Sequence, residues 1–167
     1  NVVCILKQFK KSEFILKVMD ENNTFERDLL RGQEIEKKVL NIIQKKYPKA
    51  HQIDGYFKEY DIFIPEINKS VEVKSDEQSK YTGNILVEVE FNGKPSALNT
   101  SKADYWVFWD GYKFNWFIIS RIWDCINDFN LKTRSFVGKG DVHQKKAYLI
   151  QKNKLYKYRI DFDAPKS

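Results

Sequence analysis

The chain has 167 residues, the length of one ordinary domain, and its 42% hydrophobic and 31% charged residues exclude an intrinsically disordered protein. Its net charge of +6 favours a polyanion as partner. No apolar run approaches the roughly 20 residues that span a bilayer, and no secretory cleavage site follows the first apolar residues, so we expect a cytoplasmic protein with no membrane partner.

The N-terminal half of the chain predicts strands on either side of one long helix. Strand-like runs over residues 2–9 and 13–19 predict a hairpin or an extra sheet edge. Apolar residues at helical spacing then predict a helix over residues 24–47. Three short strands follow and are expected to form an antiparallel meander, over residues 51–58, 60–64 and 70–74.

The C-terminal half predicts further strands and two shorter helices. In chain order these are a strand over residues 85–91, a short helix over 98–103, a hairpin over 104–109 and 113–119, a helix over 120–127, and a final hairpin over 147–150 and 154–160. This order of elements predicts an α+β fold in one domain over residues 1–167. The two cysteines, Cys4 and Cys125, are too few for a disulfide framework, and we expect both to be buried thiols.

Basic residues gather near the C-terminus. Residues 132–160 hold nine Lys or Arg against one Asp, whereas residues 1–131 hold 19 basic and 20 acidic residues. Such a segment attracts nucleic acid through phosphate contacts, and the candidate contacts in it are Lys139, His143, Lys145 and Lys146. The alternative is a solvated strand pair that its lysines keep soluble.

Two carboxylates are expected to converge on adjoining strands. A period of two places Glu72 and Lys74 on one face of their strand, and the meander lays the strand that carries Asp61 against it. Carboxylates among apolar residues repel one another unless a cation neutralises them, and hard oxygen ligands suit Mg²⁺ or Mn²⁺. Lys74 can hold the attacking water or stabilise charge on a phosphate, so the three residues outline a site for phosphodiester hydrolysis. The alternative is a surface pair of Glu72 and Lys74 on a half-exposed strand.

A helix with a glutamate, then an aspartate, then Glu72-Val73-Lys74 resembles the PD-(D/E)XK, or restriction-endonuclease-like, nuclease superfamily. The resemblance covers residues from about 24 to 127 and departs from the family where Tyr60 replaces the proline before the aspartate. It implies an αβββαβ core, a central mixed sheet flanked by helices, with extra strands at both ends of the chain and the basic extension over 132–160. It also implies that Asp61, Glu72 and the Val73 carbonyl bind the metal.

The resemblance implies that Glu34 is the helix carboxylate. Glu34 lies about 100° from Ile35 on a helical wheel, beside the apolar stripe. The alternative is an exposed acid paired with Lys37 or Lys38.

Two later segments add candidate residues. If the strand over 85–91 is an antiparallel partner of the Glu72 strand, Glu88 reaches the same metal cluster; otherwise Glu88 and Glu90 face solvent. Residues 101–106, Ser-Lys-Ala-Asp-Tyr-Trp, look like the segment that often follows the Glu-x-Lys strand in phage and viral members of the superfamily. Lys102 is the expected phosphate contact there.

The sequence therefore predicts a divalent-metal-dependent endonuclease that hydrolyses DNA with Mg²⁺ or Mn²⁺. One alternative is a catalytically silent nucleic-acid-binding module on the same fold. Another is an RNA-processing nuclease, because the same residues act on either polymer. The sequence leaves the oligomeric state open, and a dimer is one of the alternatives. If the protein is encoded by a phage or virus, the expected cytoplasm is that of the host cell.

Overall fold

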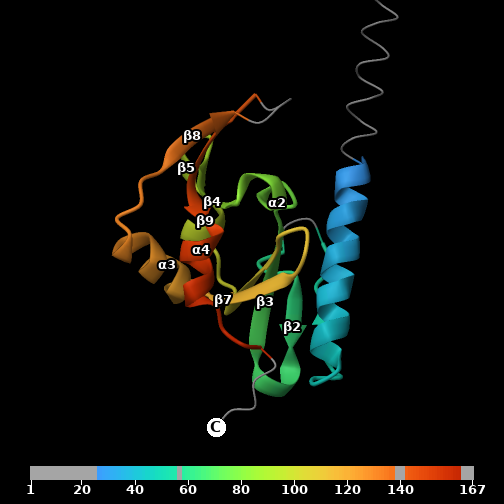
Figure 1. Cartoon of the computed structure of the whole chain (residues 1–167). Coiled ribbons are helices and arrows are strands. Elements are labelled where there is room, and N and C mark those ends of the chain that lie inside the picture. The colour runs from blue at the N-terminus through green and yellow to red at the C-terminus, as the bar shows by residue number, and fades with distance from the viewer. Residues whose placement is uncertain (1–25, 56–57, 138–141, 163–167) are drawn as a thin grey trace, which may run out of the picture. The chain divides into compact units, whose positions relative to one another are not determined.

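The computed structural model describes residues 26–55, 58–137 and 142–162 (Figure 1). The chain divides into two compact units, residues 1–34 and 35–167. The predicted strands over 2–9 and 13–19, and the residues Cys4 and Lys139, lie outside the described residues. The fold belongs to the α+β class, with a mixed five-stranded sheet and helices.

The five-stranded sheet has the order β1-β2-β3-β6-β7. Its strands are β1 (His51–Gln52), β2 (Ile62–Ile64), β3 (Lys69–Ser75), β6 (Tyr105–Trp109) and β7 (Phe114–Ile118). The first three form the predicted antiparallel meander, and β6 and β7 form the predicted hairpin. Because β6 pairs with β3 in parallel, the chain must cross over between them, and the second sheet begins in this crossover.

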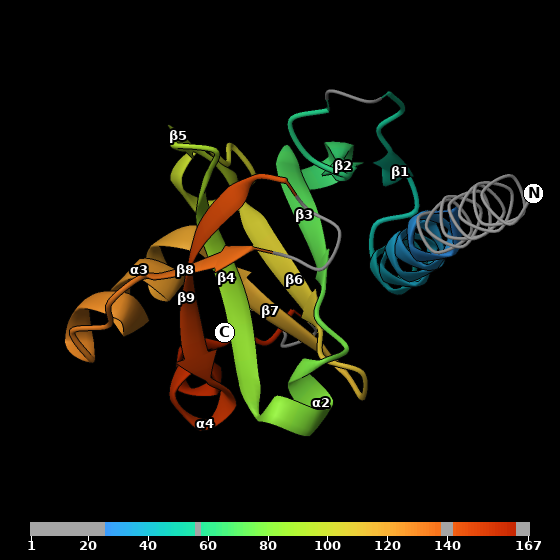
Figure 2. The ribbon, with the colours of Figure 1, turned by 90° about the horizontal axis from the view of Figure 1, so that it is seen from above.

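The second sheet is antiparallel throughout and has the order β5-β4-β9-β8. Its strands are β4 (Asn84–Phe91), β5 (Lys94–Pro95), β8 (Arg134–Val137) and β9 (Gln144–Gln151), and α2 (Ser79–Thr82) leads from β3 into β4 (Figure 2). Residues 85–91 therefore do not pair with the Glu72 strand, which was the condition under which Glu88 was expected to reach the metal cluster. The apolar face of β4 pairs instead with β9, where Ile85 lies opposite Ile150.

The predicted final hairpin is wrong. Strand β9 pairs with β8, and the residues after it form the short helices α4 (Lys152–Leu155) and η3 (Tyr156–Tyr158). Leu155, the last residue of α4, is fully buried in the core.

The remaining helices agree better with the sequence. Residues 26–44 of the predicted long helix are helical, and α3 (Ile119–Asp128) confirms the helix predicted over 120–127. The helix predicted over 98–103 is a single 3₁₀ turn, η2 (Ala97–Asn99), and a similar turn, η1 (Pro65–Ile67), joins β2 to β3. Among the described residues, no helix is long and apolar enough to cross a membrane.

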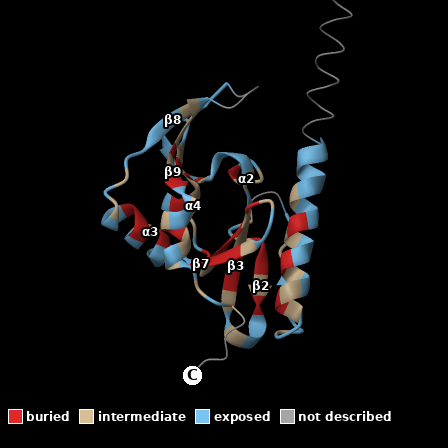
Figure 3. Ribbon diagram, in the orientation of Figure 1, coloured by how far each residue is buried: buried red, intermediate tan, exposed pale blue. Residues whose placement is uncertain are grey.

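Two groups of buried side chains form the core. One lies around β4, β6 and α3 and includes Ile85, Phe108 and Ile122, and the other joins Val39 and Ile43 of the long helix to β2, β3 and β6. Figure 3 shows buried residues along β2 and β3 and on one side of α3. Cys125 is a buried free thiol, as predicted, and burial raises its pKa to about 11.

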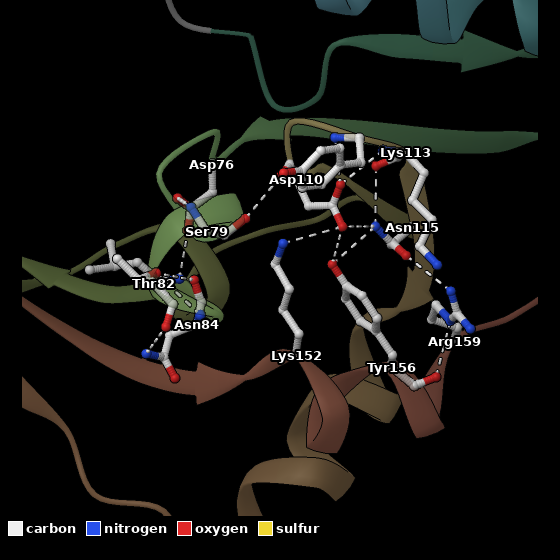
Figure 4. Close-up of polar contacts among 12 residues, drawn as sticks. Asp76, Ser79, Thr82, Asn84, Asp110, Lys113, Asn115, Lys152, Tyr156 and Arg159 are labelled. Carbon is white, nitrogen blue, oxygen red and sulfur yellow. Dashed lines mark hydrogen bonds and ion pairs between the residues drawn. The ribbon is translucent and has the colours of Figure 1, made fainter.

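A buried polar network ties the C-terminal segment to the turn between β6 and β7 (Figure 4). The carboxylate of Asp110, which is 2% exposed, accepts hydrogen bonds from the Tyr156 hydroxyl at 2.5 Å and from the backbone N–H groups of Tyr112 and Lys113 at 2.9 Å each. Lys152 Nζ lies 3.5 Å from the same carboxylate. Burial by itself raises the pKa of Asp110. The hydrogen bonds and the charge of Lys152 together have the larger effect, and they lower the pKa from 3.8 to about 2.

Candidate active site

Asp61 lies directly before β2, with its carboxylate against the neighbouring strand. Its backbone N–H donates to the Val71 carbonyl at 2.9 Å, which continues the ladder between β2 and β3. Its side chain turns back onto the same strand, where Oδ2 accepts a hydrogen bond from the Val73 N–H at 2.7 Å. Asp61 is only 6% exposed, so an acid of the predicted site is held in the protein interior.

Glu72 and Lys74 extend from the same face of β3, as their spacing of two predicts. Lys74 Nζ donates to Glu72 Oε1 at 2.5 Å and lies 5.3 Å from the ring centre of Trp106. Burial raises the pKa of Glu72 above its usual value; Lys74 lowers it and the charge of Asp61 raises it. The structure thus brings Asp61, Glu72 and Lys74 together, close enough for their charges to act on one another.

Lys58 connects these acids to the long helix. Its Nζ lies 2.8 Å from Asp61 Oδ1 and 3.0 Å from Glu36 Oε2, and all three side chains are largely buried. Burial lowers the pKa of Lys58, but the hydrogen bonds and charges of the two acids together raise it above its usual value. Sequence reasoning missed both Lys58 and Glu36.

The helix glutamate that contacts Lys58 is Glu36, and the expectation that Glu34 is the helix carboxylate stays a prediction. The side chain of Glu34 is 64% exposed and pairs with Arg31, one turn earlier, at 3.3 Å. Glu34 and Glu36 each lie about 100° from Ile35 around the helix axis, on opposite sides. The position of the apolar residues therefore does not indicate which glutamate belongs to the site. What distinguishes Glu36 from Glu34 is its contact with Lys58, a residue 22 positions later in the sequence.

A cleft of about 410 Å³ opens beside Glu72 and Lys74, and Asp61 is not among the residues that line it. Glu72, Lys74, Lys58, Lys102 and Glu88 all line it. Glu88 therefore shares the cleft with Glu72 although β4 and β3 belong to different sheets, and its Oε1 accepts a hydrogen bond from the Ser96 hydroxyl at 2.7 Å. Lys102 lies at the rim in an exposed ion pair with Glu59.

The donors at the cleft suit one small, hard cation. Mg²⁺ characteristically binds proteins through one or two carboxylates and completes its shell with water and substrate phosphate, and Asp61 and Glu72 supply that number. The N–H and C=O of a strand residue face the same edge, so the Val73 carbonyl shares the edge on which its N–H meets Asp61. Within the described part of the chain there is no group of three or more His, Cys, Asp or Glu side chains that could hold a metal.

The basic segment forms the β8–β9 side of the second sheet. Lys146 pairs with Glu90 at 3.0 Å, and Lys145 lies 5.8 Å from the ring centre of Phe91. The His143 ring packs edge-on against the same phenylalanine. Because β9 is hydrogen-bonded to β4, this basic strand lies beside the one that carries Glu88 to the cleft.

In comparisons with known proteins, no protein-family model, no curated protein and no solved structure matches the chain. The geometry of the cleft is therefore the basis on which its function is judged.

Proposed function

We propose that the protein is a divalent-metal-dependent endonuclease of the PD-(D/E)XK type that hydrolyses phosphodiester bonds in DNA. The observation that carries the proposal is that Asp61 is bound to the backbone between Glu72 and Lys74, while the Glu72 and Lys74 side chains line one cleft. A surface pair of Glu72 and Lys74 would not require a buried aspartate on the adjoining strand.

The order of the elements supports the same assignment. The long helix precedes three antiparallel strands, and the next strand of the sheet, β6, lies parallel to β3. This arrangement is compatible with an αβββαβ core in which α2, β4, β5 and η2 occupy the crossover. The second sheet is then an addition to that core.

Each side chain at the cleft has a distinct role in the proposal. Asp61, Glu72 and the Val73 carbonyl would hold Mg²⁺ or Mn²⁺, which supplies a Lewis acid at the scissile phosphate. Lys74 Nζ, with three donors, can hold the attacking water or donate to a phosphate oxygen that gains charge. Glu36 and Lys58 position Asp61 from the side of the helix.

In this proposal the basic residues bind the phosphate backbone of the DNA. Lys102 at the rim of the cleft and Lys145, Lys146 and His143 around β9 are the proposed phosphate contacts. Since Lys146 is ion-paired with Glu90, a phosphate must compete with that half-buried carboxylate. Most of the affinity is then electrostatic and falls as salt rises.

The direct test is incubation of the chain with duplex, single-stranded and branched DNA and with RNA, in Mg²⁺, Mn²⁺ or EDTA. The proposal expects cleavage of at least one DNA substrate in Mg²⁺ or Mn²⁺ and none in EDTA, with products resolved on a denaturing gel. Cleavage of RNA alone would favour the RNA-processing alternative. Binding of every substrate without cleavage would favour the silent binding module.

A further inference from the structure

A second cavity, of about 490 Å³, adjoins the cleft. The two share Lys74, Glu88, Ala97 and Trp106, so one continuous space extends from the carboxylates into the gap between the sheets. Residues of β3 and β6 line one wall of the cavity, and Leu86 and Leu149, from β4 and β9, line the other. Its volume is within the range of sites that hold a small organic group.

The lining of this cavity does not suit a phosphate. Its charged residues are one lysine, Lys74, and two acids, Asp76 and Glu88, so an anion would meet net negative charge. Leu86, Leu149 and Phe108 offer apolar surface instead. This combination suits an uncharged group that buries a broad apolar face.

Polar groups occur at one end of the cavity. Gln78 and Asn84 bring side-chain amides there, and an amide both donates and accepts hydrogen bonds. Within the described residues, the Gln78 side chain makes no hydrogen bond, and it is exposed. It is therefore available to the polar edge of a bound group.

The structure holds this end of the cavity in place before anything binds (Figure 4). The Asp76 carboxylate accepts hydrogen bonds from the Ser79 N–H at 3.2 Å and from the Leu86 N–H at 2.9 Å, and so links the start of α2 to β4. The Ser79 hydroxyl, fully buried, donates to the Asp110 carbonyl at 3.2 Å. Binding would therefore not have to order this wall first, which lowers its cost.

We propose that this cavity binds a single, unpaired nucleobase of the DNA strand whose backbone lies in the cleft. The inference rests on the proposed function for its ligand class, because the basic strand β9 directs a polyanion to the cleft that adjoins this cavity. A nucleobase has the flat apolar face and the polar edge that the lining fits. The cavity thereby becomes a determinant of which strand or structure is recognised.

The test compares two single-stranded oligonucleotides of equal length, one native and one in which every nucleotide is abasic. Affinities are measured by fluorescence anisotropy in EDTA, where the two carry the same phosphates. Wild type should bind the native strand about tenfold more tightly than the abasic strand. This is the effect expected when a base buries on the order of 60 Å² of apolar surface in the cavity. In Leu86→Trp, whose new side chain fills the cavity, this preference should disappear while affinity for the abasic strand is unchanged.

Ile118→Trp is the matched control. Ile118 is 40% exposed and Leu86 38%, and both are on strands, but Ile118, on β7, is not among the residues that line the cavity. This variant should keep the tenfold preference. Equal affinity of wild type for both strands, or a preference that survives in Leu86→Trp, would overturn the inference. Because no cleavage is measured, the base preference can stand if the nuclease proposal fails, and cleavage can be found without it.

Discussion

The Asp61 carboxylate accepts a hydrogen bond at 2.7 Å from the N–H of Val73, the residue between Glu72 and Lys74. This bond fixes one oxygen of the aspartate side chain relative to β3 through the backbone. The other oxygen of Asp61 is held by Lys58 at 2.8 Å. Metal binding at Asp61 would have to displace that lysine.

Replacement of Lys58 by methionine should therefore increase the affinity for divalent cations. The lysine charge competes for Asp61 and Glu36, and its removal leaves both acids available. We expect the Ca²⁺ concentration at which the melting temperature begins to rise to be about tenfold lower, measured by melting in a Ca²⁺ series. In EDTA the variant should melt earlier than wild type, because Asp61 loses a partner in the interior. An unchanged Ca²⁺ concentration for the onset of stabilisation would contradict the competition.

The two helix glutamates can be separated by paired substitutions. Glu36→Gln should lower the cleavage rate at least tenfold more than Glu34→Gln, because Glu36 contacts Lys58 beside Asp61 whereas Glu34 is exposed and pairs with Arg31. The measurement is the single-turnover cleavage rate of each variant in Mg²⁺. A larger loss in Glu34→Gln would support the helix carboxylate that the family resemblance implies.

Local pattern was enough to predict the meander but not the neighbour of β4. Strands β1, β2 and β3 follow one another directly in the chain, so their pairing follows from chain order. The alternation in β4 shows that one face is buried without showing which strand lies beside it. That strand, β9, comes more than 50 residues later. Its lysines make the segment look polar in the sequence, although its apolar residues pair with β4.

In residues 154–160 the local sequence pattern predicts the wrong secondary structure. Their tyrosines and isoleucine are typical of a strand, yet α4 and η3 form there. Contacts distant in sequence decide the conformation: Leu155 enters the core and the Tyr156 hydroxyl binds Asp110. Lys58 was missed for the same reason, because its role depends on Glu36 and Asp61 together and on no motif of its own.

The Asp110 network predicts a specific dependence of stability on pH. The pKa of Asp110 is about 2 in the folded chain and 3.8 ordinarily, so the carboxylate stabilises the fold above about pH 4 and this contribution is lost as pH falls toward 2. Asp110→Asn should cost about 2 kcal/mol of unfolding free energy at pH 7 and close to nothing at pH 2. Urea unfolding at several pH values measures this difference.

Asp128→Asn is the control for that measurement. Asp128 also accepts a hydrogen bond from a tyrosine hydroxyl, that of Tyr158, but the pair is exposed. Its loss should have little effect at any pH. A cost for Asp110→Asn that is the same at pH 7 and pH 2 would show that the charge of Asp110 is not what stabilises the turn.

The basic strand β9 should contribute to DNA binding through phosphate contacts. Lys145→Ala is expected to weaken binding equally for unrelated DNA sequences and to reduce the slope of log affinity against log salt by about 1. Anisotropy titrations at several salt concentrations give the slope. Lys46→Ala removes a lysine from the region just after the long helix and should leave the slope unchanged. Identical slopes for wild type and Lys145→Ala would remove β9 from the proposed interface.

Cleavage of DNA by the Lys74→Ala variant tests the central proposal most directly. Lys69→Ala is its control, since Lys69 lies at the other end of β3 in a partly buried ion pair with Asp104. We predict that Lys74→Ala loses at least a hundredfold in single-turnover rate, with melting and DNA binding close to wild type, and that Lys69→Ala cleaves normally. Cleavage by Lys74→Ala at the wild-type rate would contradict the proposed site.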